Sequence, residues 1–202
     1  FYDSLRFANW LNNGQGSAST ETGSYTLLGG TATPSNASTI ARNVGANIVL
    51  PSENEWYKAA YYIAVSASFF DYPAGSDTQT GCVAPASDTG NSANCHPAVG
   101  NATDVGAYAL SDSPYGTFDQ GGNVWEWNEQ LVSGSNRGLR GGSFGYTPDG
   151  LAASFRFSMN PATRIDGAGF RVATIPEPGT GFLVMTGRLG LAGWRKRDAR
   201  NV

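Results

Sequence analysis

Two stretches of the chain space their apolar residues as an amphipathic helix does. In the first, Asp3 or Ser4 can cap the helix, and Leu5 and Leu11 fall on one face before it ends near Asn13. In the second, Ser52 and Glu55 have the spacing of a capping box, and Trp56 follows on the buried face. We therefore predict two short helices.

The rest of the chain is polar and rich in turn-forming residues. Residues 14–47 and 66–98 show no period longer than a turn, apart from a strand-like run at 24–28. Beyond residue 98, short apolar runs alternate with Gly and Pro. These runs are residues 105–109, 124–127, 139–144 and 169–173. Short strands, long loops and two helices predict an irregular α+β fold in one domain, residues 1–175.

The composition changes abruptly after Ile175. Residues 1–175 carry 8 basic and 14 acidic side chains, whereas residues 176–202 carry 5 basic and 2 acidic ones. The acidic domain has one lysine, Lys58, which argues against a nucleic-acid partner because phosphate binding needs clustered Lys and Arg. Residues 176–202 are a separate module. Since Phe1 is not preceded by an initiator Met or an apolar leader, we expect an N-terminally truncated chain.

A candidate cation site lies between residues 115 and 127. Carboxylates at Asp119 and Glu126 flank a turn with two adjacent glycines. Such a turn can wrap carboxylate and carbonyl oxygens around one hard cation, which is the ligand set that calcium prefers. The spacing by itself also fits a plainer alternative, in which a glycine turn lies beside two core tryptophans and the acids are solvated.

Three arginines lie in strand-like surroundings, namely Arg140, Arg156 and Arg171. Arginines in such places commonly bind buried carbonyl groups or carboxylates and thereby fix loops. One of them could instead face a ligand, so both roles stay open at this point.

Four sequence blocks strengthen the cation hypothesis when they are taken together. They are Leu-Pro-Ser-Glu-Asn-Glu-Trp at 50–56, Gly-Asn-Val-Trp-Glu-Trp at 122–127, Arg-Gly-Gly-Ser-Phe at 140–144 and Gly-Phe-Arg-Val-Ala at 169–173. The set resembles the sulfatase-modifying-factor family, which includes the formylglycine-generating enzymes. The resemblance implies a C-type-lectin-like fold, in agreement with the predicted α+β pattern.

The resemblance also implies a calcium site at the glycine turn. By similarity, Asp119 and Glu126 would bind calcium through their side chains. Gly122 and Val124 would bind it through main-chain oxygens. We therefore expect calcium as a stabilising cofactor.

Active members of the family use two cysteines that follow the Arg-Gly-Gly-Ser block, bind copper(I) and convert a substrate cysteine to formylglycine. Thiolates suit this role because they hold soft copper(I) and exchange with the substrate thiol. Residues 144–156 contain no cysteine, so we expect neither copper nor a catalytic residue there. Iron-dependent relatives that make ergothioneine need several histidines, and His96 is the only one in this chain. Whether the chain is an enzyme stays open.

The chain has two cysteines, Cys82 and Cys95, both within the polar segment 66–98. In an exported protein they predict one disulfide that closes this loop. The alternative is a displaced copper or redox pair, but the two lack the close spacing or helix N-terminus expected of reactive thiols. His96 cannot complete a tetrahedral zinc site with them, because that site takes four ligands.

The tail resembles the PEP-CTERM sorting signal of Gram-negative bacteria, which an exosortase recognises in the membrane. Pro176, Glu177 and Pro178 precede an apolar stretch and a basic cluster. The resemblance implies export, transient membrane contact through the tail, and a cell-surface or extracellular location. Arg188 interrupts the apolar stretch, which is shorter than the roughly 20 residues of a full span. A basic amphipathic or disordered tail is the alternative.

Taken together, these features predict an exported, calcium-stabilised binding module. Its long loops, residues 14–47 and 66–98, would recognise a glycan, an exopolysaccharide or a protein. The alternative is an active formylglycine-generating oxidase, or another oxidase of that family. A structural surface protein without a small ligand is a third hypothesis.

Overall fold

A computed structural model describes residues 1–175 and shows an α+β domain in which loops predominate. The helices are α1 (Tyr2–Asn12) and α2 (Glu53–Tyr61). The strands are β1 (Ile48–Val49), β2 (Tyr62–Ile63), β3 (Ser68–Phe69), β4 (Gly81–Cys82), β5 (Ser92–Ala93), β6 (Trp125–Ser133), β7 (Asn136–Arg140), β8 (Phe157–Met159), β9 (Ala168–Gly169) and β10 (Ala173–Thr174). Short 3-10 helices span Pro85–Ser87 and Pro148–Leu151. The predicted fold class is confirmed.

The largest sheet has the strand order β8-β7-β6-β9. β6 and β7 form an antiparallel hairpin that turns at Gly134, whose φ of 54° suits a residue without a Cβ. β9 then adds parallel to β6, with Trp125 opposite Ala168. The first four residues of β6 are all buried, which means that both faces of the sheet are covered at this point.

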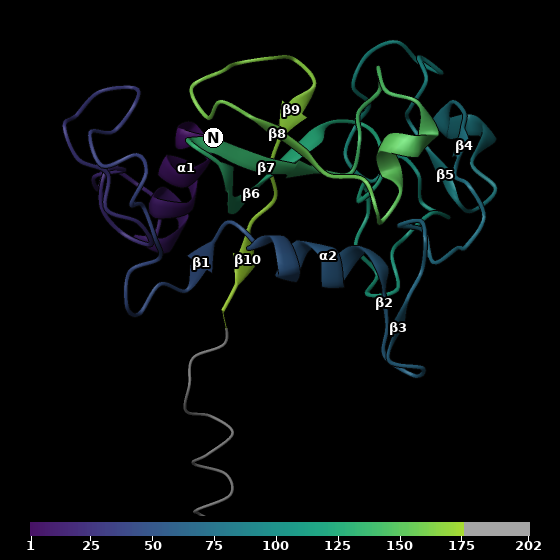
Figure 1. Cartoon of the computed structure of the whole chain (residues 1–202), viewed down its shortest axis with the longest axis horizontal. Coiled ribbons are helices and arrows are strands. Elements are labelled where there is room, and N and C mark those ends of the chain that lie inside the picture. The colour runs from purple at the N-terminus through teal and green to yellow at the C-terminus, as the bar shows by residue number, and fades with distance from the viewer. Residues whose placement is uncertain (176–202) are drawn as a thin grey trace, which may run out of the picture.

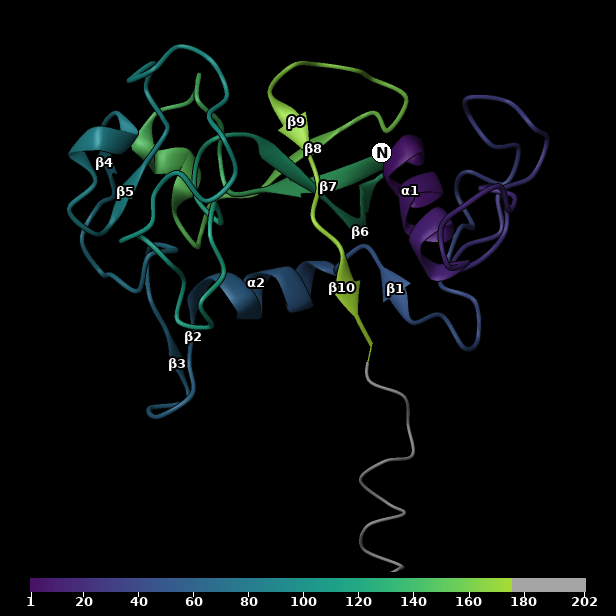
Figure 2. The same ribbon diagram turned by 180° about the vertical axis from the view of Figure 1, so that it is seen from behind.

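The helices lie against different parts of this sheet. In Figure 1, α1 lies beside one end of the sheet, and α2 runs below it. β1 pairs with β10, so that Ile48 lies opposite Thr174 just before α2 begins. The polar segments 14–47 and 66–98 extend at opposite ends of the domain, as the view from behind in Figure 2 also shows.

The core is built from the apolar faces of these elements. The main cluster includes Leu5 and Ala8 of α1, Val49 of β1 with the adjoining Leu50, and Trp125, Trp127 and Leu139 of the sheet. A second cluster under α2 contains Trp56, Ala60 and Tyr61. Burial of one large apolar side chain stabilises the fold by about 1.5–3 kcal/mol. The core therefore fixes both helices to the sheet, on which the candidate site is built.

The two helix predictions have different outcomes at the N-terminal end. α2 has the predicted capping box, because the Ser52 and Glu55 side chains each accept from the other's backbone N–H. α1 begins at Tyr2, so the prediction that Asp3 or Ser4 caps it is wrong. Phe1 holds the cap position without a side-chain hydrogen bond. Burial of Phe1 and Tyr2 in the core extends the helix to this point.

The predicted strand at 24–28 forms only a single bridge, between Tyr25 and Arg42. The side chain of Asn9 replaces a neighbouring strand here. Its amide nitrogen donates to Tyr25 O at 3.1 Å, and its oxygen accepts from Tyr25 N at 2.7 Å. The run at 105–109 likewise forms turns rather than a strand.

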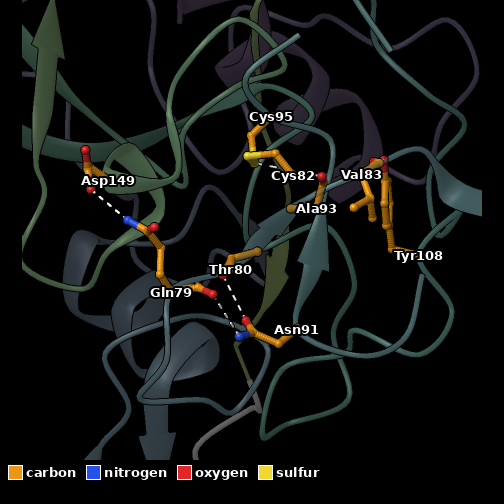
Figure 3. The surroundings of a disulfide bond; sticks show 9 residues. All are labelled: Gln79, Thr80, Cys82, Val83, Asn91, Ala93, Cys95, Tyr108 and Asp149. Atoms are coloured by element: carbon orange, nitrogen blue, oxygen red, sulfur yellow. Dashed lines mark hydrogen bonds between the residues drawn. A yellow bond between two sulfur atoms is a disulfide. The ribbon is translucent and has the colours of Figure 1, made fainter. Parts of the chain in front are cut away.

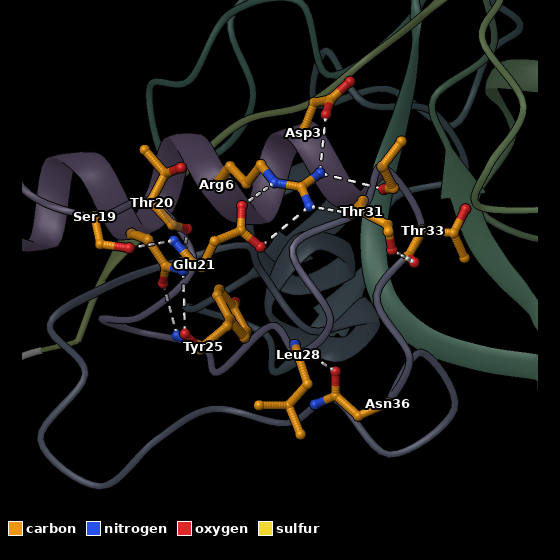
Figure 4. A network of polar contacts seen from close by, with 12 residues as sticks. Asp3, Arg6, Ser19, Thr20, Glu21, Tyr25, Leu28, Thr31, Thr33 and Asn36 are labelled. Atoms are coloured by element: carbon orange, nitrogen blue, oxygen red, sulfur yellow. Dashed lines mark hydrogen bonds and ion pairs between the residues drawn. The ribbon is translucent and has the colours of Figure 1, made fainter.

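An ion-pair network attaches the first long loop to α1 (Figure 4). Arg6 Nε donates to Glu21 Oε1 at 2.6 Å, and the same guanidinium donates to the carbonyl oxygens of Thr31 and Ala32. Asp3 contributes a longer contact of 3.2 Å to Arg6. One side chain of α1 thus holds two distant points of the 14–47 segment.

The predicted sorting signal, with Pro176, Glu177 and Pro178, lies outside the described residues. Among residues 1–175, none of the helices has the length and apolar character needed to cross a membrane.

Candidate functional site

The turn from residue 119 to residue 126 carries all four predicted calcium ligands. Asp119, Gly122 and Asn123 all have positive φ values, of 56°, 74° and 61°. A Cβ at Gly122 would lie 2.5 Å from Asn94 O, so this position requires glycine. Asn123 N donates to the same oxygen at 2.8 Å. The turn is therefore held tightly against the segment that carries Asn94.

Glu126 lies at the start of β6 and is almost fully buried. Its Oε2 accepts from Trp56 Nε1 at 2.6 Å and also from Arg171 Nε. Its Oε1 accepts from an Arg171 terminal nitrogen at 2.6 Å. Because both carboxylate oxygens already have strong donors, Glu126 does not fit the role of a calcium ligand in this arrangement.

Arg171 closes the turn from the other side. Besides Glu126, it donates to the carbonyl oxygens of Phe118 and Asp119, each at 3.1 Å. Burial alone would lower the pKa of Arg171, but the charge and hydrogen bonds of Glu126 raise it above its ordinary value. Of the two open roles for this arginine, the geometry supports the structural one.

Other oxygens near the turn remain available to a cation. Asp119 Oδ2 accepts from Gly106 N at 2.6 Å, which leaves Oδ1 without a hydrogen bond among the described residues. Asn94 Oδ1 and Gln120 Oε1 are buried and have no partner in the part of the chain that the structure describes. Among residues 1–175 there is no group of three or more His, Cys, Asp or Glu side chains arranged to hold a metal. A cation here would need amide and main-chain oxygens.

A second buried carboxylate, Glu53, was not singled out by the sequence. It accepts from Arg140 Nε at 2.8 Å and from Arg156 Nε at 2.6 Å. Arg140 also donates to the carbonyl oxygens of Ala153 and Phe155. The only sequence feature that could have indicated Glu53 is its position directly after Ser52, the capping residue of α2. The network joins α2, β7 and residues 153–156.

Residues 144–156, where the family places its cysteine pair, contain apolar and aromatic packing instead. Tyr146 packs edge-on against Trp125, with ring centroids 4.9 Å apart. Leu151 is fully buried and packs in one cluster with Ala93 and Cys95. Tyr61 donates from its hydroxyl to Leu151 O at 2.9 Å. Residues 144–156 are thus anchored by these contacts to β6, α2 and the disulfide region.

The predicted disulfide joins Cys82 and Cys95, whose Cα atoms are 4.9 Å apart (Figure 3). It joins the last residue of β4 to the chain just after β5, and Cys95 packs with Leu151 of the 144–156 segment. Gln79 Nε2 donates to Asp149 Oδ1 at 2.9 Å across the same boundary. No free cysteine remains among residues 1–175.

His96 also contacts this segment, but through its backbone. Its N–H donates to Tyr146 O at 2.7 Å, and its side chain is exposed. Its φ of 45° places it in the left-handed region. The imidazole therefore takes no part in a cluster with the two cysteines.

Comparisons with known proteins agree with this architecture. A family model described as the sulfatase-modifying factor enzyme 1-like domain matches residues 1–175. Hercynine oxygenase of Mycolicibacterium smegmatis is 32% identical over 147 residues, which cover 61% of this chain and 32% of that protein. Hercynine oxygenase of Mycolicibacterium thermoresistibile is also 32% identical over 147 residues, with 61% and 31% covered. The chain thus spans about a third of the length of these relatives.

Two solved structures share the fold. Treponema denticola variable protein 1 superposes with a TM-score of 0.65 at 22% identity, covering 87% of this chain and 69% of that one. CarF superposes with a TM-score of 0.60 at 24% identity, covering 86% of this chain and 65% of that one. At these identities the superpositions establish the fold and nothing about ligands.

Proposed function

Because the chain belongs to the sulfatase-modifying factor enzyme 1-like family, we propose that it uses the family scaffold as an exported binding module. Its ligand would be a glycan, an exopolysaccharide or a protein, bound by surfaces at the loop-rich ends of the domain. The tail at 176–202 would direct the chain through an exosortase to the cell surface or beyond. The acidic, lysine-poor domain supports a partner other than nucleic acid.

One observation carries the proposal. Residues 144–156 contain no thiol, and both cysteines of the chain are joined to each other in the disulfide. Copper(I) chemistry on a substrate cysteine needs free thiolates, and a disulfide offers none. In this segment Leu151 is buried in an apolar cluster and Tyr146 packs against Trp125, so apolar and aromatic side chains stand where the family has its cysteine pair.

The second candidate is an oxidase, and the 32% identity to two hercynine oxygenases favours it. The formylglycine-generating form of the oxidase hypothesis is tested by incubating the protein with copper(I), oxygen and a peptide containing Cys-x-Pro-x-Arg. We expect no change in peptide mass, because there is no thiol pair to hold the metal. A mass shift corresponding to conversion of cysteine to formylglycine would contradict the binding-module proposal. A cysteine-containing family member that is active serves as the positive control.

Calcium stays part of the proposal, with a changed ligand set. The free Asp119 oxygen and the unpartnered amide oxygens of Asn94 and Gln120 support a cation near the turn. The main-chain oxygens of Gly122 and Val124 would complete the ligand set. Glu126 would not belong to it, because its carboxylate is paired with Arg171. Calcium accepts six to eight oxygen ligands of this kind.

The changed ligand set gives a specific expectation for thermal unfolding. We expect calcium to raise the melting temperature of the wild type relative to the same protein in EDTA, because calcium binds only the folded state. Asp119→Asn should abolish this rise, since it removes the charge of the ligand. Glu126→Gln should unfold at a lower temperature but keep the rise. Equal melting of the wild type in calcium and in EDTA would refute the cofactor assignment.

A further inference from the structure

A cluster of exposed and half-buried aromatic rings lies where α2, the β2–β3 hairpin and a later loop meet. We call Tyr57, Tyr62, Phe69 and Tyr115 the aromatic patch. The Phe69 ring lies 5.1 Å from those of both Tyr57 and Tyr62, measured between centroids. Tyr115 stacks on Tyr62 with centroids 6.5 Å apart and planes 15° from parallel. Three separate chain segments thus contribute to one aromatic surface.

The patch is accessible to a ligand. Phe69 is 47% exposed and Tyr115 is 48% exposed, and the side chains of Tyr57 and Tyr62 are half-buried. Figure 1 shows the β2–β3 hairpin extending away from the sheet beyond the end of α2. Folding removes apolar area from water, so a cluster in which the Phe69 and Tyr115 rings stay exposed beside two half-buried tyrosines indicates a binding surface.

The polar groups around the patch are also unused. Within residues 1–175, the hydroxyl groups of Tyr57, Tyr62 and Tyr115 make no side-chain hydrogen bond, which leaves three phenols for a ligand. Lys58 Nζ lies 5.2 Å from the Tyr62 ring centroid. Lys58 forms no ion pair with any described residue and is the only lysine of residues 1–175.

We propose that the aromatic patch binds a polysaccharide whose sugar rings carry carboxylates, that is, a uronic acid polymer. Sugar rings present flat faces of C–H groups that stack on aromatic rings, and they present hydroxyls that pair with phenol groups. The single positive charge of Lys58 complements a uronate beside the stacked ring. This inference rests on the proposed binding role and names its surface and ligand class.

Charge favours this ligand only locally. Residues 1–175 carry more acidic than basic side chains, which repels a polyanion at long range. At physiological salt that repulsion is screened beyond about 8 Å. The short-range contact between Lys58 and a uronate therefore dominates the electrostatic contribution to binding. A neutral glycan would use the rings and hydroxyls but leave Lys58 without a counter-charge.

The test is titration calorimetry of the whole chain with a mannuronate hexamer, with cellohexaose as the neutral comparison. We expect the wild type to bind the mannuronate hexamer more tightly than cellohexaose. Phe69→Ala and Tyr115→Ala should each weaken mannuronate binding about tenfold, because each removes a stacking face. Lys58→Gln should weaken mannuronate binding about threefold and leave any cellohexaose binding unchanged.

Phe7→Ala is the matched control, because Phe7 is 41% exposed and lies on α1, at the other end of the domain from the hairpin. It should bind like the wild type, and far-ultraviolet circular dichroism should show every variant folded. The proposal is overturned if the wild type binds neither hexamer, if both bind equally, or if Tyr115→Ala binds unchanged. Such a result leaves the binding-module proposal standing as long as the peptide in the copper assay is unmodified.

Discussion

Replacing Glu53 with glutamine is expected to lower the free energy of unfolding by about 3–5 kcal/mol. Glu53 is almost fully buried and is the common carboxylate partner of Arg140 and Arg156. Glutamine keeps the shape of the side chain but removes the charge that compensates Arg140, whose side chain is only 9% exposed. Urea denaturation at neutral pH measures the loss.

Glu55→Gln provides the matched control, because it lies on the same helix and its side chain is 48% exposed. It keeps the capping-box geometry and loses a partly exposed ion pair to Arg42, which costs about 1 kcal/mol or less. Equal destabilisation by the two substitutions would contradict the importance of the buried network.

The stability difference between the wild type and Glu53→Gln should depend on pH. Burial opposes ionisation of Glu53, but hydrogen bonds and charge from Arg156 and Arg140 outweigh it and lower its pKa below the ordinary value. A carboxyl with a lowered folded-state pKa contributes its stability above the unfolded-state pKa and loses it as the pH falls through the folded-state value. The stability gap between wild type and Glu53→Gln should therefore be constant above about pH 5 and shrink below about pH 4.

Arg171→Met should destabilise the domain by a similar amount, about 3–5 kcal/mol. It leaves the Glu126 carboxylate buried with Trp56 as its only remaining side-chain donor among the described residues. It also removes the donors that hold the carbonyl oxygens of Phe118 and Asp119 in the turn. Thermal and urea unfolding both report the loss.

A double variant separates the ion pair from the packing of the side chains. Arg171→Met combined with Glu126→Gln removes both charges, so it should recover part of the stability that Arg171→Met alone loses. If the double variant is destabilised by the sum of the two single losses, the ion pair is not coupled and the assigned role of Arg171 is incorrect. Arg164→Met, with an arginine side chain that is 77% exposed, should unfold like the wild type.

The features that the sequence predicted correctly depend on neighbouring residues. The capping box of α2 needs only Ser52 and Glu55, three positions apart. The prediction of the disulfide needed only the observation that Cys82 and Cys95 lie within one polar segment. The family blocks predicted the fold because each block is itself contiguous.

The features that were missed depend on residues far apart in sequence. Glu126 lies 45 positions from Arg171, and Glu53 lies 87 and 103 positions from Arg140 and Arg156. No local period shows which arginine meets which carboxylate, so the roles of all three arginines stayed open. The run at 24–28 resembled a strand because its composition suits one, yet Asn9 satisfies the backbone of Tyr25 from a helix.

The pairing of β1 with β10 has a consequence for the order in which the chain folds. Ile48 meets Thr174 at the very end of the domain, and Arg171 reaches Glu126 only shortly before that. A chain still on the ribosome lacks these contacts until its last strand has emerged. The domain therefore completes its fold only after residue 174 has left the ribosome, because closure of such long loops precedes the contacts that stabilise them.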